Sequence, residues 1–442
     1  MASPARWANQ VQSEHLLPSR VQSAGSVTVV GLNYGPESTG IAPYTSGLAR
    51  ELASRSWRVR VLSGFPHYPQ WRFVDGPIPR SRTSVEDGVM VVRRRHRLPA
   101  KPGGMARALS ELSFGVAAVS TPFGRPDVVV LVSPALISSA VALVKARLVT
   151  RRPVVVWVQD LYTLGLRELG GGGSSLSSLV VAAIERWTLR SADSVVVIHE
   201  RFRDTIVEEL GVRRASVAVV RNWSHLDDDW QVDRDASRAA LGWGPSEFVV
   251  LHAGNMGVKQ GLENVVEAAR LAAAIGAKVR FVLLGDGNQR SALAELAAGV
   301  PNMEMIGSLP DDEFRDALAS ANALLVNERA GVAGMAVPSK LTSYFSTGLP
   351  VIAATDSGSV TESEVLLAGA GPIVPAGDPQ ALLDAALALA GDAQRARDMG
   401  EAGRRFRAER LTAAASFDTF AQLLKTLANG RRSTATRESG TA

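Results

Sequence analysis

The stretch FVVLHAGNMGVKQG, residues 248–261, joins an apolar run to a turn that contains three glycines. The run FVVLHAG at 248–254 is typical of a buried β-strand, and a helical pattern begins near Leu262. Backbone N–H groups at the start of that helix, the helix dipole and Lys259 would together hold a diphosphate. An exposed loop lysine at position 259 is the simpler alternative.

The same alternation of strand and helix continues on both sides of this stretch. Short Val- and Leu-rich runs predict parallel strands that are covered on both faces. In the first half these runs occupy residues 26–32, 58–64, 89–95, 127–133, 153–159 and 193–199. In the second half they occupy residues 248–254, 278–285, 303–308, 323–328 and 350–355. We therefore expect an α/β protein with two Rossmann-like, doubly wound parallel sheets that face each other across a cleft.

The strand pattern lapses over residues 221–247, where Asp, Trp and Gly are frequent, and this lapse marks the domain boundary. We expect a disordered N-terminal arm at 1–25 and a disordered tail at 429–442, because both ends are polar. Between them the expected parts are a first domain at 26–222, a connector at 223–247, a second domain at 248–400, and a C-terminal helix at 401–428 that packs back on the first domain.

Composition excludes several kinds of site. The 442 residues include no cysteine, which excludes disulfides, a cysteine nucleophile and thiolate metal sites. The six histidines lack the spacing of a metal site. The net charge is +5, yet residues 50–107 hold thirteen Arg or Lys against four Asp or Glu. This excess suggests an anionic membrane surface or a phosphorylated substrate, although a solvated face in an arginine-rich chain would look the same. No nucleic-acid partner is expected, because no recognition motif accompanies the basic run.

No membrane-spanning segment is expected. The longest uncharged apolar stretch, 128–144, is interrupted by Pro134 and falls short of the roughly 20 residues that a spanning helix needs. Residues 1–25 lack the apolar core of a secretory signal. We expect a cytoplasmic protein, with peripheral contact at the inner face of the plasma membrane as one option. The segment 101–120 fits either an interfacial helix or a packed surface helix.

The first glycine-bearing turn does not match a common cofactor motif. The segment GPESTG at 35–40 has the spacing of a P-loop, but Ile41 stands where the lysine would be. No GxGxxG follows the first strand, which disfavours a nicotinamide cofactor. Gly40 remains a candidate for backbone contact with an anion, although such turns often need glycine for their geometry alone.

Later turns in the second half add a further cation. LGDG at 284–287 follows one strand, and PSK at 338–340 precedes another. Lys340 would lie near a helix start that faces the same cleft as Lys259. Two lysines and two helix starts around one crevice suit the diphosphate leaving group of a nucleotide.

With these motifs in order, the second half resembles the retaining glycosyltransferases of family 4, which have the GT-B fold. The segments GNMGVKQG, LLGDGNQR, MIGSLPDDEF, PSKLTSYFSTGLPVIA and IVPAGDP occur in the family's usual order. The first half is similar to the branch that builds colanic acid and other capsular or exopolysaccharides, through residues 33–71 and the segments WVQDLY and RNWS. The resemblance covers residues 26–425.

The resemblance implies a function for each domain. The first domain would bind a glycan or polyprenyl-diphosphate-linked acceptor, and the second a UDP- or GDP-linked sugar. Lys259 and Lys340 would stabilise the departing diphosphate, and Asp160 would orient or deprotonate the acceptor, unless it only caps a strand end. No cofactor or metal ion is implied. The implied donor-binding residues are Gly254, Asn255, Gly257, Gly285, Gly287, Ile306, Ser339, Ser343 and Glu362, and the implied acceptor-side residues are Gly40, His67 and Gln159.

The chain also departs from the family pattern. The two glutamates of the donor loop correspond to Met335 and Ser343, and Glu328 lies seven residues before the first of these positions. Asn255 stands in place of a common arginine, and Gln159 in place of a common histidine. A variant active site and an inactive copy are both consistent with these losses.

Other interpretations stay open for some residues and for the whole chain. Glu362 could be ordinary helix N-terminal charge, and His67 could be structural. The acidic run at 227–229 fits a solvated connector better than a metal site. For the whole chain the alternatives are a sugar-nucleotide epimerase and a non-catalytic sugar-nucleotide-binding partner of a polysaccharide assembly complex.

Overall fold

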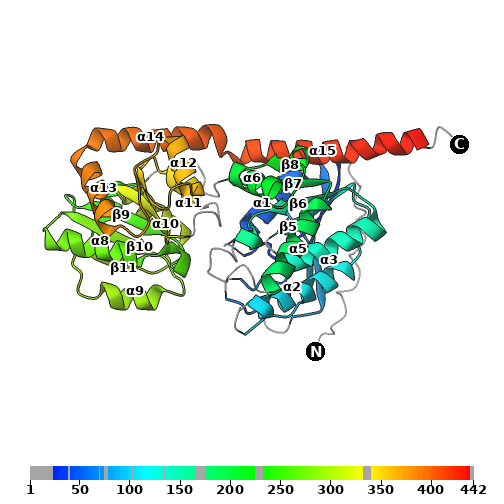
Figure 1. Cartoon of the computed structure of the whole chain (residues 1–442), viewed down its shortest axis with the longest axis horizontal. Helices are drawn as coiled ribbons and strands as arrows, with labels where there is room; N and C mark the ends of the chain where they lie inside the picture. The colour runs from blue at the N-terminus through cyan, green and yellow to red at the C-terminus, as the bar shows by residue number, and fades with distance from the viewer. Residues whose placement is uncertain are drawn as a thin grey trace, which may run out of the picture.

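A computed structural model of the chain shows two α/β units side by side (Figure 1). The structure describes residues 23–37, 40–68, 70–73, 78–100, 104–133, 135–164, 176–223, 232–331 and 340–438. Each unit is built around its own mainly parallel sheet, so the expected fold class is confirmed.

The first sheet has eight strands in the order β3-β4-β2-β1-β5-β6-β7-β8. All neighbouring strands are parallel except β3 and β4. The central strands β1 and β5 are buried along their whole length, as expected for valine-rich strands with helices on both faces. The strands are β1 (Gly25–Val30), β2 (Trp57–Gly64), β3 (Ser81–Glu86), β4 (Val89–Arg94), β5 (Val128–Ser133), β6 (Val154–Val158), β7 (Ser194–Val197) and β8 (Val217–Val219).

The hairpin β3–β4 is an addition to the expected strands. Its turn is Asp87-Gly88, and both residues have positive φ, 49° and 77°. An Asp-Gly pair favours such a two-residue hairpin turn, so the signal is present in the sequence. The strand β3 was not predicted because its sequence, SRTSVE, is polar and lies at the exposed edge of the sheet.

The second sheet has six parallel strands in the order β11-β10-β9-β12-β13-β14. Its central strand β9 is the run with which the sequence argument began. The strands are β9 (Phe248–Ala253), β10 (Val279–Leu284), β11 (Met303–Ile306), β12 (Ala323–Asn327), β13 (Val351–Ala354) and β14 (Ile373–Val374).

Helices cover both sheets. On the first unit they are α1 (Ala42–Ser54), α2 (Gly104–Val119), α3 (Leu136–Lys145), the π-helical turn η1 (Ala146–Thr150), α5 (Leu176–Arg190), α6 (Glu200–Glu208) and the short turn η2 (Arg214–Ser216). On the second unit they are α7 (Arg234–Ala240), the short turn η3 (Val258–Gln260), α8 (Glu263–Ala274), α9 (Arg290–Ala297), α10 (Asp311–Ser320), α11 (Lys340–Ser346), α12 (Val360–Ala368), α13 (Pro379–Gly391) and α14 (Ala393–Arg410).

The last helix, α15 (Ala413–Glu438), returns to the first unit and lies along it (Figure 1). Phe420 and Leu424 are fully buried in the core beneath the first sheet. The ring of Phe420 packs edge-on against Trp157 of β6 at 5.2 Å between centroids. The helix reaches Glu438, so residues 429–438 are helical and not the disordered tail that their polarity suggests. A helix that is already anchored extends at little cost.

Part of the expected connector is folded. Residues 224–231 lie outside the described residues, but α7 packs on the second unit. Arg238 is buried there and donates hydrogen bonds to the carbonyl oxygens of Ser320, Gly244 and Glu247. From residue 232 onward the connector therefore belongs structurally to the second unit, whereas Trp223 is buried in the core of the first.

A buried ionic cluster joins the two units. Nε2 of His199, which follows β7, lies 2.9 Å from Oε1 of Glu364 in α12. Arg221 donates hydrogen bonds to the same oxygen and to Glu200. Burial favours the neutral form of Glu364, but the hydrogen bond from His199 and the charge of Arg221 outweigh it and lower the pKa of that carboxyl group.

Candidate functional site

Two glycine turns cross at the carboxyl ends of β9 and β10. A Cβ atom at Gly285 would lie 2.1 Å from the carbonyl oxygen of Gly254, and one at Gly287 would lie 2.3 Å from that of Met256. Gly254 and Gly285 also have positive φ, 128° and 134°. These glycines allow two backbones to touch at the cleft edge of the second sheet, which gives them a structural reason independent of any ligand.

Lys340 begins α11 at the same edge. Its Nζ atom lies 3.2 Å from Nε2 of His252, at the end of β9. The other ring nitrogen of His252, Nδ1, lies 3.2 Å from the carbonyl oxygen of Leu325, to which it donates. His252 is buried, and burial together with the charge of Lys340 holds its pKa well below the usual range, so its Nε2 accepts from the ammonium group.

Glu328 follows β12 and faces the same lysine. Its two carboxylate oxygens accept hydrogen bonds from the hydroxyl groups of Thr355 and Thr361. Burial raises the pKa of Glu328, while the two threonines and the charge of Lys340 oppose the rise. Burial lowers the pKa of Lys340 to about 8, and Glu328 works in the opposite direction. Lys340 thus lies between a neutral imidazole and a carboxylate.

The sequence motifs do not predict His252, and they place Glu328 outside the donor loop. Glu328 lies too early for the family's donor-loop glutamate, and His252 looked like an isolated histidine within a strand. The signal that would have found both is position, because each is a polar residue at the carboxyl end of a buried strand in the donor-side sheet. Such ends line the ligand crevice of open α/β sheets.

Lys259 and Asp160 come together from different units. Lys259 lies in η3, after β9, and Asp160 lies just beyond β6 of the first sheet. The side chain of Asp160 borders a cavity that is open to water. Protein atoms surround it on its other sides. Burial raises the pKa of Asp160 to about 6, and the charges of Lys259 and Arg107 work to lower it. The structure therefore places a cation of the second unit within electrostatic reach of a carboxylate of the first.

The acceptor-side candidates line one cavity of about 340 Å³ in the first unit. Gly40, His67, Gln159 and Asp160 all border it. Its other lining residues are Leu32, Asn33, Ile41, Tyr44, Tyr68, Trp71, Arg107, Ser110, Glu111, Ile198 and Asn222. Aromatic rings, amides and charged groups around a space of this size suit a polar organic ligand.

Hydrogen bonds hold two of these candidates in place. Gln159 and Asn222 exchange a reciprocal pair of amide hydrogen bonds of 3.2 and 2.8 Å. The backbone N–H of His67 donates to Oε1 of Glu37, while its Nδ1 lies 2.9 Å from the carbonyl oxygen of Phe65. Both side chains are buried and fixed, which fits a wall of the cavity.

The remaining donor-side candidates are more dispersed. Asn255 is exposed in its turn, Gly257 precedes η3, and the carbonyl oxygen of Ile306 accepts from the N–H of Gly285 at 3.0 Å. Ser343 lies partly buried in α11. The carboxylate of Glu362 accepts from the N–H of Gly358 before α12, as an N-terminal helix charge does. Ser339, Met335 and the acidic run 227–229 lie outside the described residues.

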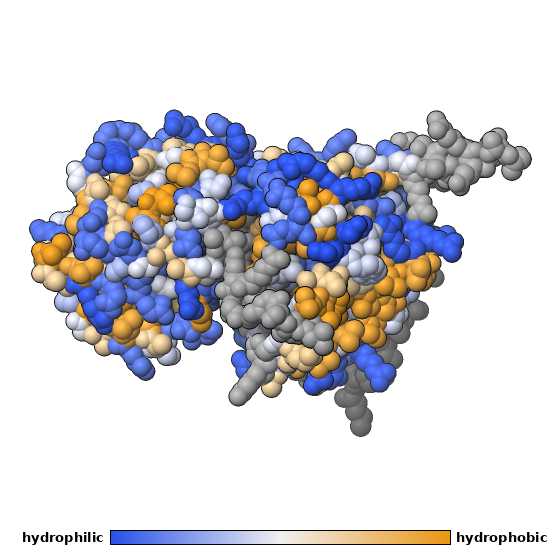
Figure 2. Space-filling view, in the orientation of Figure 1, coloured by the Kyte–Doolittle hydropathy of each residue, from blue (hydrophilic) through white to orange (hydrophobic). Residues whose placement is uncertain are grey.

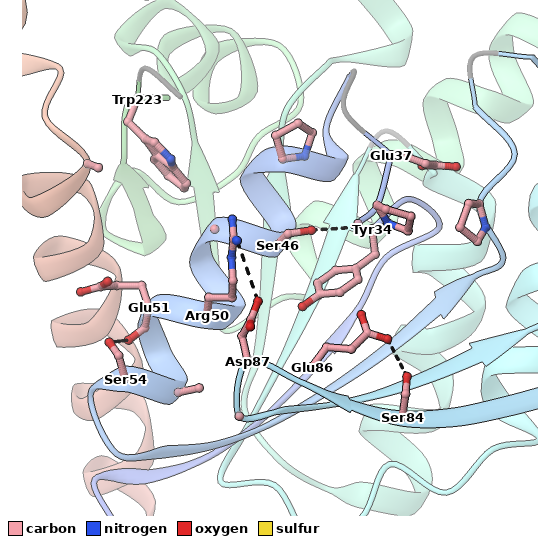
Figure 3. Close-up of a pocket in the computed structure, with 18 of the residues that line it drawn as sticks. Tyr34, Glu37, Ser46, Arg50, Glu51, Ser54, Ser84, Glu86, Asp87 and Trp223 are labelled. Atoms are coloured by element: carbon pink, nitrogen blue, oxygen red, sulfur yellow. Dashed lines mark hydrogen bonds and ion pairs between the residues drawn. The ribbon is translucent and has the colours of Figure 1, made fainter. Parts of the chain in front are cut away.

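A larger cavity, about 1470 Å³, lies on the other side of the loop that contains Glu37. Tyr34, Arg50, Glu86 and Asp87 line it from the first unit, and Phe314 of α10 lines it from the second. In Figure 3 the Tyr34 ring extends toward the carboxylates of Glu86 and Asp87. None of Lys259, Lys340 and Asp160 borders this space, so we place the candidate site at the smaller cavity and the facing sheet edge.

Comparison with known proteins gives the family. A model described as "Glycosyl transferase 4-like domain" matches residues 39–223, and one described as "Glycosyl transferases group 1" matches residues 247–392. A glycosyl transferase of Escherichia coli assigned to colanic acid biosynthesis, WcaI, is 31% identical over 73% of this chain and 81% of its own length. The chain belongs to glycosyltransferase family 4. The glycosyltransferase is therefore an enzyme by family, and the resemblance drawn from its motifs is confirmed.

Solved structures agree on the fold of this glycosyltransferase. Sucrose-phosphate synthase from Thermosynechococcus elongatus superposes with a TM-score of 0.69 at 18% identity, over 91% of this chain and 99% of its own. The Anabaena protein HepE in complex with UDP-glucose superposes with a TM-score of 0.66 at 16% identity, over 91% and 100%. At such identities the likeness concerns the fold, which is GT-B.

The described part of the glycosyltransferase contains neither a cluster of metal-ligating side chains nor a helix that could span a membrane. Within those residues, no group of three or more His, Asp or Glu side chains is arranged to hold a metal ion. Likewise, none of the helices described there combines the length and the apolar character that crossing a bilayer requires.

Proposed function

We propose that this glycosyltransferase moves a sugar from a UDP- or GDP-linked donor to a glycan or lipid-linked acceptor in surface polysaccharide biosynthesis, with retention at the anomeric carbon. The observation that carries the proposal is that Lys259 and Asp160, which come from different units, lie within electrostatic reach of each other. The name of WcaI supports the polysaccharide pathway, and the UDP-glucose complex of HepE supports a nucleotide-sugar donor.

On the donor side, the chemistry requires stabilisation of the departing diphosphate. Lys259, Lys340 and the backbone N–H groups near the crossed glycine turns supply preorganised positive charge there. His252 and Glu328 hold Lys340 in one position. In this proposal the charges of the chain itself carry the leaving group, and no metal ion is needed.

On the acceptor side, Asp160 orients the attacking hydroxyl. The bond between the anomeric carbon and the phosphate oxygen breaks, and the acceptor oxygen bonds to the same face of the sugar. The hydroxyl proton passes to the departing diphosphate, either directly or by way of Asp160. Because the leaving group accepts the proton, the pair of carboxylates that a glycosidase uses is not required.

Substitution of the two lysines tests the donor site. We expect Lys259→Ala and Lys340→Ala each to lower turnover about tenfold or more, because each removes a preformed charge from the leaving group. The melting temperature should change little. Lys278→Ala, at an exposed lysine of the same unit, is the matched control and should keep full turnover. Full turnover in either test variant would remove that lysine from the mechanism.

Calorimetric titration with UDP, GDP, TDP and ADP, with and without Mg²⁺, tests the donor class. We expect one nucleotide to bind in the micromolar range without Mg²⁺ and to lose affinity in both lysine variants. Tight binding of a nucleotide without sugar transfer to any acceptor would instead indicate a non-catalytic binding partner. Binding that depends on Mg²⁺ would contradict the metal-independent mechanism.

A further inference from the structure

Helix α2 exposes a row of apolar side chains. Met105, Leu109, Leu112 and Val116 are 72%, 41%, 42% and 55% exposed. Their spacing of four, three and four residues places them on one face of the helix. The opposite face is buried through Ser110, Phe114 and Ala118, so α2 is a packed helix whose outer face is also apolar.

Neighbouring helices continue this apolar surface. Helix α3 packs against both α2 and α5, and Figure 2 shows hydrophobic residues gathered over this side of the first unit. We call the surface of α2, α3, η1 and α5 the apolar face. Beyond α2 its exposed members are Val144, Leu148, Val149, Leu179, Val180 and Trp187. A contiguous exposed patch of this kind is uncommon on a soluble domain and marks an interaction site.

The charged side chains exposed on the elements of the apolar face are basic, although Arg147 pairs at 3.0 Å with Asp193, which lies just beyond α5. Its four elements contain only two carboxylates, Glu111 and Glu185, and each is just 2% exposed. The same elements contain five basic residues, Arg107, Lys145, Arg147, Arg186 and Arg190. Arg151 and Arg152 follow η1 directly. An incoming anionic surface would therefore meet arginines and apolar side chains, with no exposed carboxylate from these elements to repel it.

Helix α2 also forms a wall of the acceptor cavity. Arg107, Ser110 and Glu111 border that cavity together with Asp160. The hydroxyl of Tyr162 donates to Oε1 of Glu111 at 2.6 Å, which fixes the helix against the cavity. One helix thus presents its outer face to a partner and its inner residues to the acceptor site.

We propose that the apolar face docks this glycosyltransferase on an anionic lipid bilayer, so that a lipid-linked acceptor reaches Asp160 along α2. The inference rests on the proposed function for the nature of the acceptor. A bilayer fits the mixture of aliphatic side chains, Trp187 and peripheral arginines, because such side chains enter the headgroup boundary while cations pair with lipid phosphates. A second copy of the chain would bring the same arginines face to face, which disfavours self-association.

Vesicle flotation tests the docking. The intact protein should float with vesicles of phosphatidylglycerol and phosphatidylcholine in equal parts, less with phosphatidylcholine alone, and less as salt is raised. Leu109→Gln, Leu112→Gln and Val116→Gln combined should lower the partition coefficient about tenfold or more. The matched control combines Ile275→Gln, Leu366→Gln and Leu367→Gln, at three comparably exposed apolar positions of the second unit, and should float like the parent protein.

Flotation, sedimentation, melting temperature and nucleotide titration together distinguish the possible outcomes. Absence of flotation at low salt, or flotation that the α2 variant retains, would overturn the proposal. A stable dimer in sedimentation that the α2 variant dissociates would assign the face to a second copy instead. Melting temperature and nucleotide titration are measured on every variant, and both should match the parent protein. Loss of flotation with intact nucleotide binding supports the docking, whereas absence of nucleotide binding in the parent protein concerns the proposed function alone.

Discussion

At the residue scale, Asp160 and Glu328 are two carboxylates whose pKa burial raises but whose hydrogen-bond partners differ. Both have a raised pKa, but threonine hydroxyls satisfy Glu328 while Asp160 opens into a cavity. A carboxylate that lacks such hydroxyl partners among the described residues and borders a ligand space is suited to hold or accept a substrate proton. Glu328 is suited to hold the neighbouring Lys340.

The pKa of Asp160, about 6, gives a testable pH dependence. If the ionised form holds the acceptor, the ratio kcat/KM should fall about tenfold per pH unit below this value. Asp160→Asn should lower kcat/KM by about 100-fold or more and abolish that acidic limb. Asp204→Asn, at a surface carboxylate beside Arg203 and Arg214, is the control. An unchanged acidic limb in the Asp160→Asn variant would assign the limb to another group.

The same residue should give the stability of the protein a pH dependence opposite to that of its activity, so that stability falls as pH rises. Because the folded pKa lies above the ordinary value of 3.8, the folded state binds the extra proton between the two values and loses stability as pH rises through that window. Asp160→Asn removes this loss. The variant should therefore melt at the same or a higher temperature near neutral pH, as expected when a carboxylate is kept for function.

Some site residues were predictable from the sequence and others were not. Lys259, Lys340 and Asp160 were predicted from the order of the motifs. In the structure Lys259 and Asp160 each follow a strand, and Lys340 begins α11. His252 and Glu328 did not follow, because their role depends on which strand ends lie side by side. The sheet order sets β9 next to β12, and no local pattern in the sequence encodes that neighbourhood.

At the scale of elements, the buried strands were predictable because valine-rich runs have few alternatives to the centre of a parallel sheet. The edge strand β3 and the far end of α15 were not, because their polar residues gain their structure from the elements beside them. The return of α15 depends on apolar residues such as Phe420, whose partner Trp157 lies more than half the chain away.

Substitution of Phe420 tests how much the packing of α15 on the first unit contributes to stability. It is fully buried and packs on Trp157. Phe420→Ala should lower the free energy of unfolding by about 3–5 kcal/mol, through lost transfer energy and the cavity left behind. Thr419→Ala, on the exposed side of the same helix, should change it by less than about 0.5 kcal/mol. Equal effects of the two substitutions in urea denaturation would show that α15 is not part of the core.

At the scale of the whole molecule, the chain connects its two units three times. It passes through the connector, returns along α15, and joins them side chain to side chain through His199, Arg221 and Glu364. Ser416 near the start of α15 donates to the carbonyl oxygen of Arg221 at 2.8 Å, which links the second and third connections. The proximity of Lys259 to Asp160 depends on this arrangement, since the two residues belong to different units.

Glu364 is the residue on which this arrangement should depend most. Its replacement by Gln keeps the volume and an acceptor oxygen but removes the buried negative charge that faces His199 and Arg221, for which only the interaction of Arg221 with Glu200 remains, so the free energy of unfolding should fall by about 1.5–3 kcal/mol. The control Glu267→Gln breaks an exposed pair with Arg270 and should cost less than about 1 kcal/mol.

Since the folded pKa of Glu364 lies below its ordinary value of 4.5, the contribution of Glu364 to stability is complete above that value and is lost as pH falls through the folded pKa. In urea denaturation, the free energy of unfolding should therefore decrease more steeply on acidification for the parent protein than for Glu364→Gln. Turnover of the variant should also be lower than that of the parent protein, because the two units are held together less firmly. Parallel acid profiles for the two proteins would mean that the cluster does not hold the units together.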